Sequence, residues 1–412
     1  MAVVIGLGLW RLSTTPRASG QLPASAYVWQ LRHDGAVRAA LTERLGAFDH
    51  GTVLAAEVRI VAGHVVTQRV DLAEDALRGR PVALAIRVGP KAFAARDPFA
   101  DELVALAQEL VGDARANGID VTELQLDYDC PSSRLSLYAE FLERLGEDLG
   151  VLEPPPILTV TALPTWLSHD EMTAVADAVE LYVLQLHSLE QPHHVTDRIA
   201  LFEPKRARDT IERAGRLGRP YRVSLPSYGY LATFGADGRF IGLVAEAAPR
   251  PLPVGAQQRP LMAEAPELAR FVRSLHEDRP ASLQAVAWYR LPVDGDRLAW
   301  RWPTLQRVMK GEPVAAALVI EARPRPDDPL LVELVLRNDG SSDAAMPHAL
   351  VVSHGSLVAA DALAGFSMTR RAPHSMTLEA SAPSRLPPGE QRVVAWLRRI
   401  TTTEEIRADA EG

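Results

Sequence analysis

The sequence predicts an α/β protein, a (β/α)8 TIM barrel followed by a small C-terminal β-sandwich. Between residues 26 and 291, eight short apolar runs alternate with longer segments of helical period, which is the order and size typical of a closed parallel barrel. After residue 292 the pattern changes to short strand-like runs separated by Pro and Gly turns. An open doubly wound sheet is the competing arrangement, but it would bring a Gly-rich phosphate loop after an early strand, and we find none.

The eight apolar runs are the expected barrel strands. Several are rich in Val, Ile and Leu without clean alternation, as is typical of parallel strands that are covered on both faces. The runs are residues 26–31, 52–60, 82–88, 124–129, 157–162, 181–186, 221–225 and 283–291.

The segments between the runs have the spacing and the ends of helices. Residues 101–117 carry apolar side chains at three- and four-residue spacing, and Gly118 follows as a stop. Ser168 and Glu171 have the spacing of a capping box ahead of another apolar pattern. Further helices are expected at residues 131–149, 206–217 and 265–275.

The connection after the seventh run is too long for a plain loop. It covers residues 227–260, and within it residues 230–234 and 239–244 flank Gly235-Ala236-Asp237-Gly238, a pattern that predicts a β-hairpin. Because the βα loops of a barrel lie at its catalytic face, we expect this insertion to wall or cover a substrate cleft.

The C-terminal part predicts a short helix at residues 303–310 and then a small β-sandwich. We therefore place the barrel at residues 25–311, the sandwich at 312–400 and a polar, frayed tail at 401–412. The sandwich strands are expected at residues 315–322, 330–337, 349–352 and 392–398.

Residues 1–24 are interpreted as a possible truncated export signal or linker. Residues 1–10 are apolar and small residues follow near Ala18 and Ala24, although a basic n-region is missing. This favours a periplasmic or exported protein. A frayed apolar tail of a cytoplasmic protein is the alternative.

Composition excludes several classes of protein. A hydrophobic fraction of 47% with 23% charged residues is ordinary globular composition, so a disordered chain or a coiled coil is excluded. A net charge of −8 and only three lysines argue against a nucleic-acid partner. No apolar run is long enough for a transmembrane helix, and the single cysteine, Cys130, excludes an internal disulfide. The oligomeric state is left open.

The sharpest candidate for catalysis lies in residues 124–131, which read LQLDYDCP. In a strand, Asp127 and Asp129 point to the same side, and two carboxyl groups so close together do not both ionise readily. An acid that keeps its proton beside an ionised partner can protonate a glycosidic oxygen, and we assign the general acid to Asp129. Capping of the next helix, or pairing with arginines, is the structural alternative.

The ends of the other runs supply groups suited to a sugar. Aromatic rings stack on the apolar faces of pyranose rings, while Gln, Arg and Tyr reach hydroxyl groups. The expected substrate-binding residues are Trp29, Gln30, Glu57, Arg87, Gln185, His187, Tyr228, Trp288, Tyr289 and Arg290, with Tyr230 beside Tyr228.

A metal site is a weaker alternative. His187, His193 and His194 could join the two aspartates as ligands, but they lack a recurring ligand spacing. No serine lies in a Gly-x-Ser-x-Gly elbow, which argues against a serine hydrolase. The sequence therefore predicts no metal and no cofactor.

The Asp127–Asp129 run resembles the acid strand of the chitinase-like (family 18) glycoside hydrolases, which ends Asp-x-Asp-x-Glu before Tyr-Pro. The resemblance implies that Asp127 orients an acetamido group, that Asp129 is the general acid and that Trp288 floors the sugar site. This chain departs from the family where Gln125 replaces an aspartate, where Asp129 replaces a glutamate, and where Gln185 and His187 replace a Tyr-Asp pair.

Over roughly residues 26–400 the chain also resembles a bacterial family known only as a domain of unknown function. The resemblance rests on residues 28–30 (VWQ), on the Gln125-x-Asp-x-Asp strand and on residues 288–290 (WYR). It implies a barrel with sugar-enzyme ancestry. We expect a glycoside hydrolase-like protein that acts on a polysaccharide. The alternatives are a non-catalytic carbohydrate-binding or scaffold protein and a metal-dependent polysaccharide deacetylase.

Overall fold

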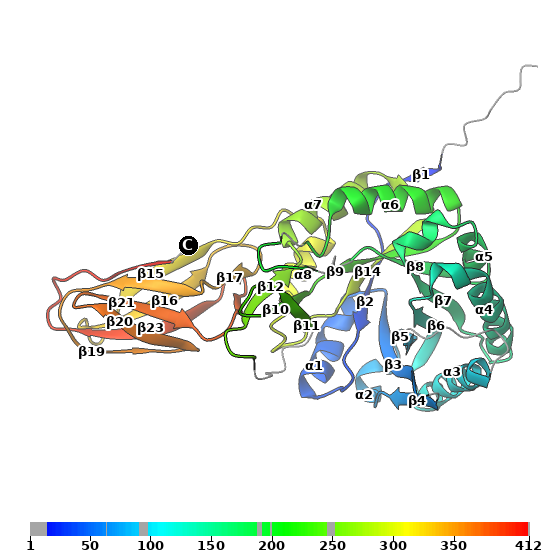
Figure 1. Cartoon of the computed structure of the whole chain (residues 1–412), viewed down its shortest axis with the longest axis horizontal. Coiled ribbons are helices and arrows are strands. Elements are labelled where there is room, and N and C mark those ends of the chain that lie inside the picture. Colours follow the sequence, from blue (N-terminus) through cyan, green and yellow to red (C-terminus); the bar gives the residue numbers. More distant parts are fainter. Residues whose placement is uncertain are drawn as a thin grey trace, which may run out of the picture.

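A computed structural model describes residues 15–62, 64–89, 98–187, 192–197, 200–244 and 252–410. Eight parallel strands close into a barrel in chain order, with the last strand paired to the first (Figure 1). They are β2 (Ala24–Val28), β3 (His50–Val61), β5 (Pro81–Val88), β6 (Asp120–Tyr128), β7 (Ile157–Ala162), β8 (Leu181–Gln185), β9 (Tyr221–Pro226) and β14 (Leu283–Tyr289). The predicted barrel is confirmed, with a strand at each of the eight apolar runs.

Helices surround the barrel, and one large apolar cluster lies between them and the outer faces of the strands (Figure 1). Gly218 ends its helix in the left-handed region at φ 71°, as the stop pattern predicts. The capping box does not form, because Ser168 ends a 3-10 turn and the helix that follows has no side-chain cap. The helices are α1 (Gly35–Arg44), α2 (Glu74–Leu77), α3 (Pro98–Ala116), α4 (Leu135–Leu149), α5 (Met172–Asp177), α6 (Pro204–Leu217), α7 (Ala265–Glu277) and α8 (Trp302–Met309).

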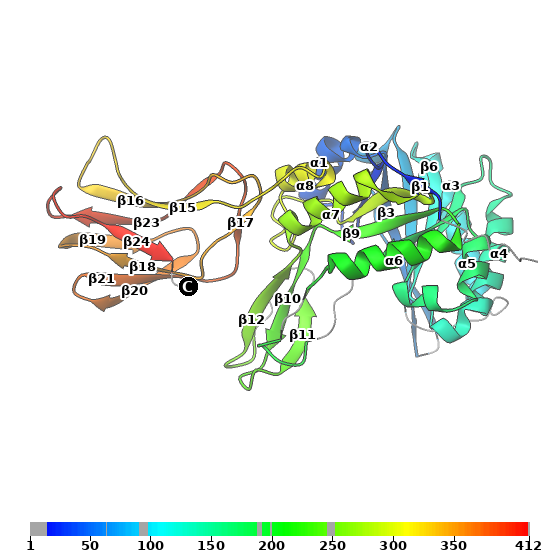
Figure 2. The ribbon, with the colours of Figure 1, turned by 90° about the horizontal axis from the view of Figure 1, so that it is seen from above.

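Two antiparallel additions extend the barrel. Strand β4 (His64–Arg69) folds back on β3; its exposed sequence carries too little apolar pattern to predict it. The long connection forms the expected hairpin of β10 (Gly229–Phe234) and β11 (Phe240–Val244), and β12 (Gln257–Met262) joins it as a third strand. Figure 2 shows these three strands projecting from the barrel as a separate sheet.

The C-terminal part consists of two four-stranded antiparallel sheets around a shared apolar core. The sequence predicts a frayed tail at residues 401–412, but within it β24 (Arg407–Ala410) pairs with β18 (Ala349–Ser353). One sheet holds β15 (Leu318–Pro324), β16 (Leu331–Asn338), β19 (Leu357–Ala362) and β23 (Gln391–Arg399). The other holds β18 (Ala349–Ser353), β20 (Phe366–Ala372), β21 (Ser375–Ala380) and β24 (Arg407–Ala410).

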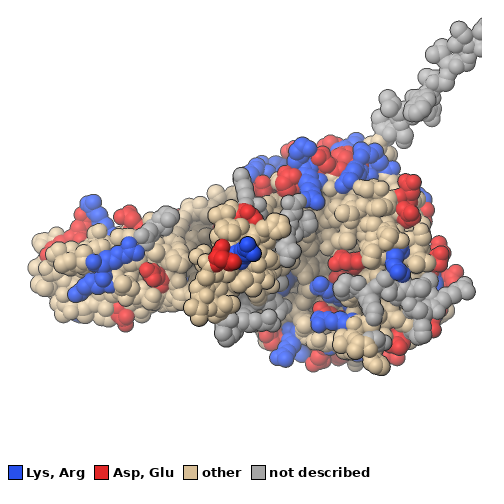
Figure 3. Space-filling model, viewed as in Figure 1, with Lys and Arg blue, Asp and Glu red and all other residues tan. Residues whose placement is uncertain are grey.

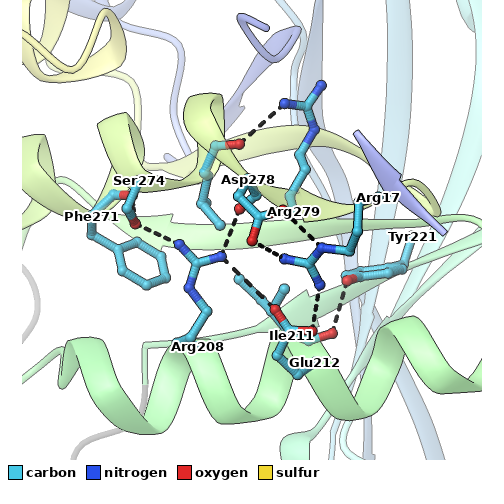
Figure 4. A network of polar contacts seen from close by, with 10 residues as sticks. Arg17, Arg208, Ile211, Glu212, Tyr221, Phe271, Ser274, Asp278 and Arg279 are labelled. Atoms are coloured by element: carbon cyan, nitrogen blue, oxygen red, sulfur yellow. Dashed lines mark hydrogen bonds and ion pairs between the residues drawn. The ribbon is translucent and has the colours of Figure 1, made fainter. Parts of the chain in front are cut away.

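The start of the described chain is fastened to the barrel. The apolar residues 1–10 that suggest export lie outside the described residues, but β1 (Arg17–Ala18) pairs with β13 (Arg279–Pro280). Arg17 binds both carboxylate oxygens of Asp278 at 2.6 and 2.8 Å and reaches Glu212 at 2.6 Å (Figure 4). The sequence interpretation places residues 17–18 in an export signal or linker, but they pair with β13 and are part of the packed structure.

The C-terminal sheets meet the barrel at α8 and at the inserted three-stranded sheet. Asp343 is buried and accepts hydrogen bonds from the Arg301 backbone N–H at 2.7 Å and from the Thr304 hydroxyl at 3.0 Å. A hollow of about 660 Å³ lies between the inserted sheet and the C-terminal sheets; its walls include Leu231 and Met346. On the face seen in Figure 3, acidic and basic side chains are interspersed. Among the described residues, no helix is both long and apolar enough to span a bilayer.

Candidate functional site

A cavity of about 200 Å³ opens at the carboxyl ends of the barrel strands. We call it the barrel cavity. All the barrel strands except β3 contribute lining side chains at or near their carboxyl ends, as expected of a barrel active site. Its lining residues are Tyr27, Trp29, Arg87, Asp127, Asp129, Thr161, Gln185, His187, Ser224, Tyr228, Tyr230 and Tyr289.

The structure brings together most of the residues that the sequence singles out. Asp127 and Asp129 line the barrel cavity, together with six of the expected binding residues, which are Trp29, Arg87, Gln185, His187, Tyr228 and Tyr289. The remaining four, Gln30, Glu57, Trp288 and Arg290, do not line it.

Trp288 does not floor the barrel cavity, contrary to what the chitinase-like resemblance implies. Its side chain is 1% exposed, lies in the outer apolar cluster and packs against Trp300 with ring centroids 6.3 Å apart. Side chains alternate between the two faces of a strand, so Trp288 points outward when its neighbour Tyr289 points inward. Tyr289 is the aromatic group that this strand supplies.

The other three expected binding residues, Arg290, Glu57 and Gln30, lie outside the cavity lining. Arg290 is buried and forms an ion pair with Asp296 at 2.5 Å. Glu57 lies beside Arg87 in the strand register but pairs with Arg59. Gln30 directly follows Trp29 and has its side-chain oxygen buried without a hydrogen bond.

Sequence reasoning missed three lining residues, Tyr27, Thr161 and Ser224. Tyr27 lies two residues before Trp29, and Ser224 lies two residues before the end of β9. The two-residue repeat of a strand could have found them, because a known inward residue fixes which others share its face.

Asp127 is the less exposed member of the acid pair. The Thr161 hydroxyl donates to its Oδ1 at 2.7 Å, and its side chain faces the cavity from the end of β6. Burial raises the pKa of Asp127 above its ordinary value, with the charge of Asp129 adding to the shift, while Thr161 and Arg87 oppose it. Asp129 is exposed at the cavity mouth, one turn of the pleat further along. The surroundings of Asp127 thus shift its carboxyl group towards the protonated form.

His187 joins a chain of hydroxyl groups on the far wall of the cavity. Its Nε2 lies 3.2 Å from the Ser224 hydroxyl and its Nδ1 lies 3.4 Å from the Tyr228 hydroxyl, which is 2.8 Å from that of Tyr230. The imidazole also stacks on Tyr289 with ring centroids 5.2 Å apart. Burial lowers the pKa of His187 to about 4. At neutral pH the ring is therefore uncharged and acts as a hydrogen-bonding group.

Aromatic rings form the wall on the side of β2 and β14. Tyr27, Trp29 and Tyr289 contact one another with ring centroids 5.4 to 5.6 Å apart and interplanar angles of 56° to 79°. Edge-to-face contacts of this kind hold each ring in place. The cavity therefore offers a rigid aromatic surface opposite polar groups.

A column of polar side chains inside the barrel supports the cavity from below. The Tyr27 hydroxyl donates to Gln125 Oε1 at 2.7 Å, and the Gln125 amide donates to Thr159 at 3.2 Å. Thr159 donates to Glu123 at 2.6 Å, and Arg222 binds both oxygens of Glu123 at 2.8 and 2.9 Å. A continuous hydrogen-bonded path thus fixes Tyr27 from the lower part of the barrel.

Of the three histidines in the metal alternative, His187 lines the barrel cavity, whereas His193 and His194 do not. The backbone N–H groups of His193 and His194 donate to Asp197 in their own loop, at 2.8 and 2.9 Å. Within the described ranges, no group of three or more His, Cys, Asp or Glu side chains is placed to hold a metal ion.

Residues 78–294 match the family described as domain of unknown function DUF3142, which covers more than half of the chain. The chain belongs to this family. Residues 321–399, within the C-terminal sheets, match a second domain of unknown function, DUF8456. No curated protein matches the chain.

Solved structures similar to this DUF3142 chain include a spore cortex-lytic enzyme and chitinases. The spore cortex-lytic enzyme SleL of Bacillus cereus is 12% identical, with a TM-score of 0.48 over 72% of this chain and 75% of that chain. A chitinase of Chromobacterium violaceum is 14% identical, with a TM-score of 0.47 over 70% of this chain and 99% of that chain. The GH18 chitinase ChiB of Flavobacterium johnsoniae is 12% identical, with a TM-score of 0.44 over 71% and 94%.

Proposed function

We propose that this DUF3142 protein is a glycoside hydrolase-like enzyme that cleaves a polysaccharide by carboxylate acid–base catalysis in the barrel cavity. The observation that carries the proposal is that Asp127 and Asp129 share one cavity with a wall of aromatic rings. Aromatic rings suit the apolar faces of sugars, and paired carboxyl groups in unlike surroundings suit glycosidic bond cleavage.

In this proposal Asp127 donates the proton to the leaving glycosidic oxygen. Its burial favours the protonated form, which a general acid needs, and the Thr161 hydroxyl orients the carboxyl group. Asp129 at the cavity mouth is the second carboxyl group, placed to stabilise the positive charge that develops on the sugar, and a water molecule then adds to the anomeric carbon. These roles reverse the assignment from sequence, where Asp129 is the acid, because burial distinguishes the two residues and spacing does not.

The test is hydrolysis of a panel of polysaccharides and aryl glycosides by the full chain. Asp127→Asn and Asp129→Asn should each lower turnover by about 10²–10⁴-fold, the usual contribution of acid–base groups. Asp120→Asn is the matched control, because Asp120 is exposed at the opposite end of the same strand, and it should keep full activity. Full activity in either cavity variant would refute the mechanism. Glycan binding without product, unchanged in Asp129→Asn, would instead select a non-catalytic carbohydrate-binding protein.

A further inference from the structure

Arg87 is the one cationic side chain among the described residues that line the barrel cavity. Three carboxyl groups surround it, yet within the described part of the chain it forms no ion pair within 4.0 Å and no hydrogen bond. Glu57 pairs with Arg59, and Asp127 accepts from Thr161. The guanidinium N–H donors are therefore available to a ligand.

A second unused donor lies in the same cavity. Trp29 is 7% exposed, and its indole N–H is buried without a hydrogen-bond partner. Buried donors in folded proteins are normally satisfied, so the unpaired Trp29 N–H indicates a ligand that brings an acceptor atom. Arg87 is exposed to the solvent of the same cavity and adds a cation that no carboxylate contacts. Trp29 follows β2 and Arg87 lies in β5, with only β3 between the two strands.

We propose that the barrel cavity binds a carboxylated sugar and that Arg87 holds its carboxylate, an inference that rests on the proposed saccharide-binding function. The planar guanidinium matches a carboxylate with two parallel hydrogen bonds. Neutral groups such as Gln185 and Tyr228 are enough for sugar hydroxyls. A neutral sugar that covers Arg87 would displace its water without supplying a counter-charge.

The charges around Arg87 are compatible with an acidic ligand. Burial alone would lower the pKa of Arg87, but the acidic groups around it, Asp127 first, raise it above the ordinary value, so the side chain remains a cation. Asp127 accepts a hydrogen bond from Thr161 and Glu57 pairs with Arg59, so both of these carboxyl groups have protein partners of their own. The exposed Asp129 carboxylate is the main repulsive charge left at the mouth.

The experiment measures binding of matched acidic and neutral sugars to the full chain by NMR, following the Trp29 indole and Arg87 Nε–H resonances. The pairs are methyl glucuronide with methyl glucoside, methyl galacturonide with methyl galactoside, and N-acetylmuramic acid with N-acetylglucosamine. In at least one pair the acidic member should bind about tenfold more tightly, the range of a charge-assisted hydrogen-bonded pair. Arg87→Gln should abolish this preference, and Arg87→Lys should keep only part of it.

Arg69→Gln is the control, because Arg69 is an arginine of β4 outside the cavity, and the preference should survive in it. No acidic preference in any pair, or equal weakening of both members by Arg87→Gln, would overturn the inference. Hydrolysis decides the proposed function separately. Acid-selective binding without hydrolysis would support the role of Arg87 and refute the proposed hydrolase activity. Hydrolysis of neutral glycans without acid selectivity would support the hydrolase activity and refute the role of Arg87.

Discussion

Asp127 is the residue on which the cavity charges act most directly. The neighbouring Asp129 carboxylate raises its pKa, and the Arg87 guanidinium lowers it. Removing one or the other charge should therefore move the pKa of Asp127 in opposite directions.

The prediction is that Asp129→Asn lowers the pKa of Asp127 and that Arg87→Gln raises it. Titration of the Asp127 carboxyl carbon by ¹³C NMR measures both shifts without requiring activity. The Asp120→Asn variant serves as control and should leave the titration curve in place, since Asp120 lies at the other end of the strand. Shifts of the same sign in both cavity variants would show that local unfolding, and not charge, controls Asp127.

His187 predicts a pH dependence of stability. Burial lowers the pKa of His187 to about 4, whereas a histidine in an unfolded chain has a pKa of about 6.5. Between these values the unfolded chain takes up a proton that the folded chain does not, so stability falls as the pH falls through this window. Each pH unit below the unfolded pKa of about 6.5 lowers the free energy of unfolding by about 1.36 kcal/mol. At pH 5 this residue should therefore lower it by about 2 kcal/mol.

Urea unfolding at pH 7 and pH 5 measures this loss, and His187→Gln should remove it while other histidines keep their contributions. The same pH dependence in the variant and the wild type would mean that the His187 ring is not buried in its neutral form.

At the scale of single residues, the sequence predicts which strand ends carry the site but not which face each residue takes. Trp288 and Tyr289 are both aromatic and adjacent, and only the pleat decides that Tyr289 lines the cavity. In the same way, the sequence does not decide which of the neighbours Trp29 and Gln30 lines the cavity, and the structure shows that Trp29 does. Burial, which distinguishes Asp127 from Asp129, depends on neighbours from other strands and cannot be inferred from spacing.

At the scale of elements, strand β6 has an apolar outer face and a polar inner face. Leu124, Leu126 and Tyr128 join the outer cluster, while the alternate residues Glu123 and Gln125 are buried inside the barrel. Polar residues inside a barrel must satisfy their hydrogen bonds there, which Arg222, Thr159 and Tyr27 provide. This alternation is present in the sequence, but the run is apolar enough to be taken for a strand that is buried on both faces.

Glu123→Gln should therefore destabilise the barrel strongly. Arg222 would keep its charge, only 11% exposed, without the carboxylate that binds it, and breaking a buried pair typically costs about 3–5 kcal/mol. The double variant Glu123→Met with Arg222→Met is the matched comparison, because it removes both charges and should recover most of the loss. Urea unfolding measures both. A loss below about 1 kcal/mol for Glu123→Gln would mean that water reaches Arg222.

Element prediction succeeds where the apolar pattern is long and fails where a segment is short and polar. All eight barrel strands follow from the sequence because each carries an apolar run, and the hairpin after β9 follows from the Gly235–Gly238 turn between two strand-like runs. Strands β4 and β24 are mostly exposed and gain their hydrogen bonds from partners far along the chain or across a turn, which no local pattern records.

At the scale of the whole molecule, Asp343 connects the C-terminal sheets to the barrel. It accepts hydrogen bonds from the backbone N–H of Arg301, just before α8, and from the Thr304 hydroxyl, with its side chain buried. Asp343→Ala should lower the free energy of unfolding by about 1–2 kcal/mol, as the loss of a helix cap does, and should loosen the two parts.

Limited proteolysis between residues 311 and 317 measures the loosening, and cleavage there should become faster in Asp343→Ala. Asp361→Ala provides the comparison, because Asp361 is an exposed residue of β19 in the same sheets and should leave cleavage unchanged. Equal cleavage rates in all three proteins would show that other contacts hold the junction.

The strand β10 touches two separate spaces. Tyr230 lines the barrel cavity, and the next residue, Leu231, lines the larger hollow that Met346 closes from the C-terminal side. The two residues share one stretch of backbone, so a displacement of β10 moves both side chains. A change at the C-terminal sheets that displaces β10 would therefore also shift Tyr230 in the barrel cavity.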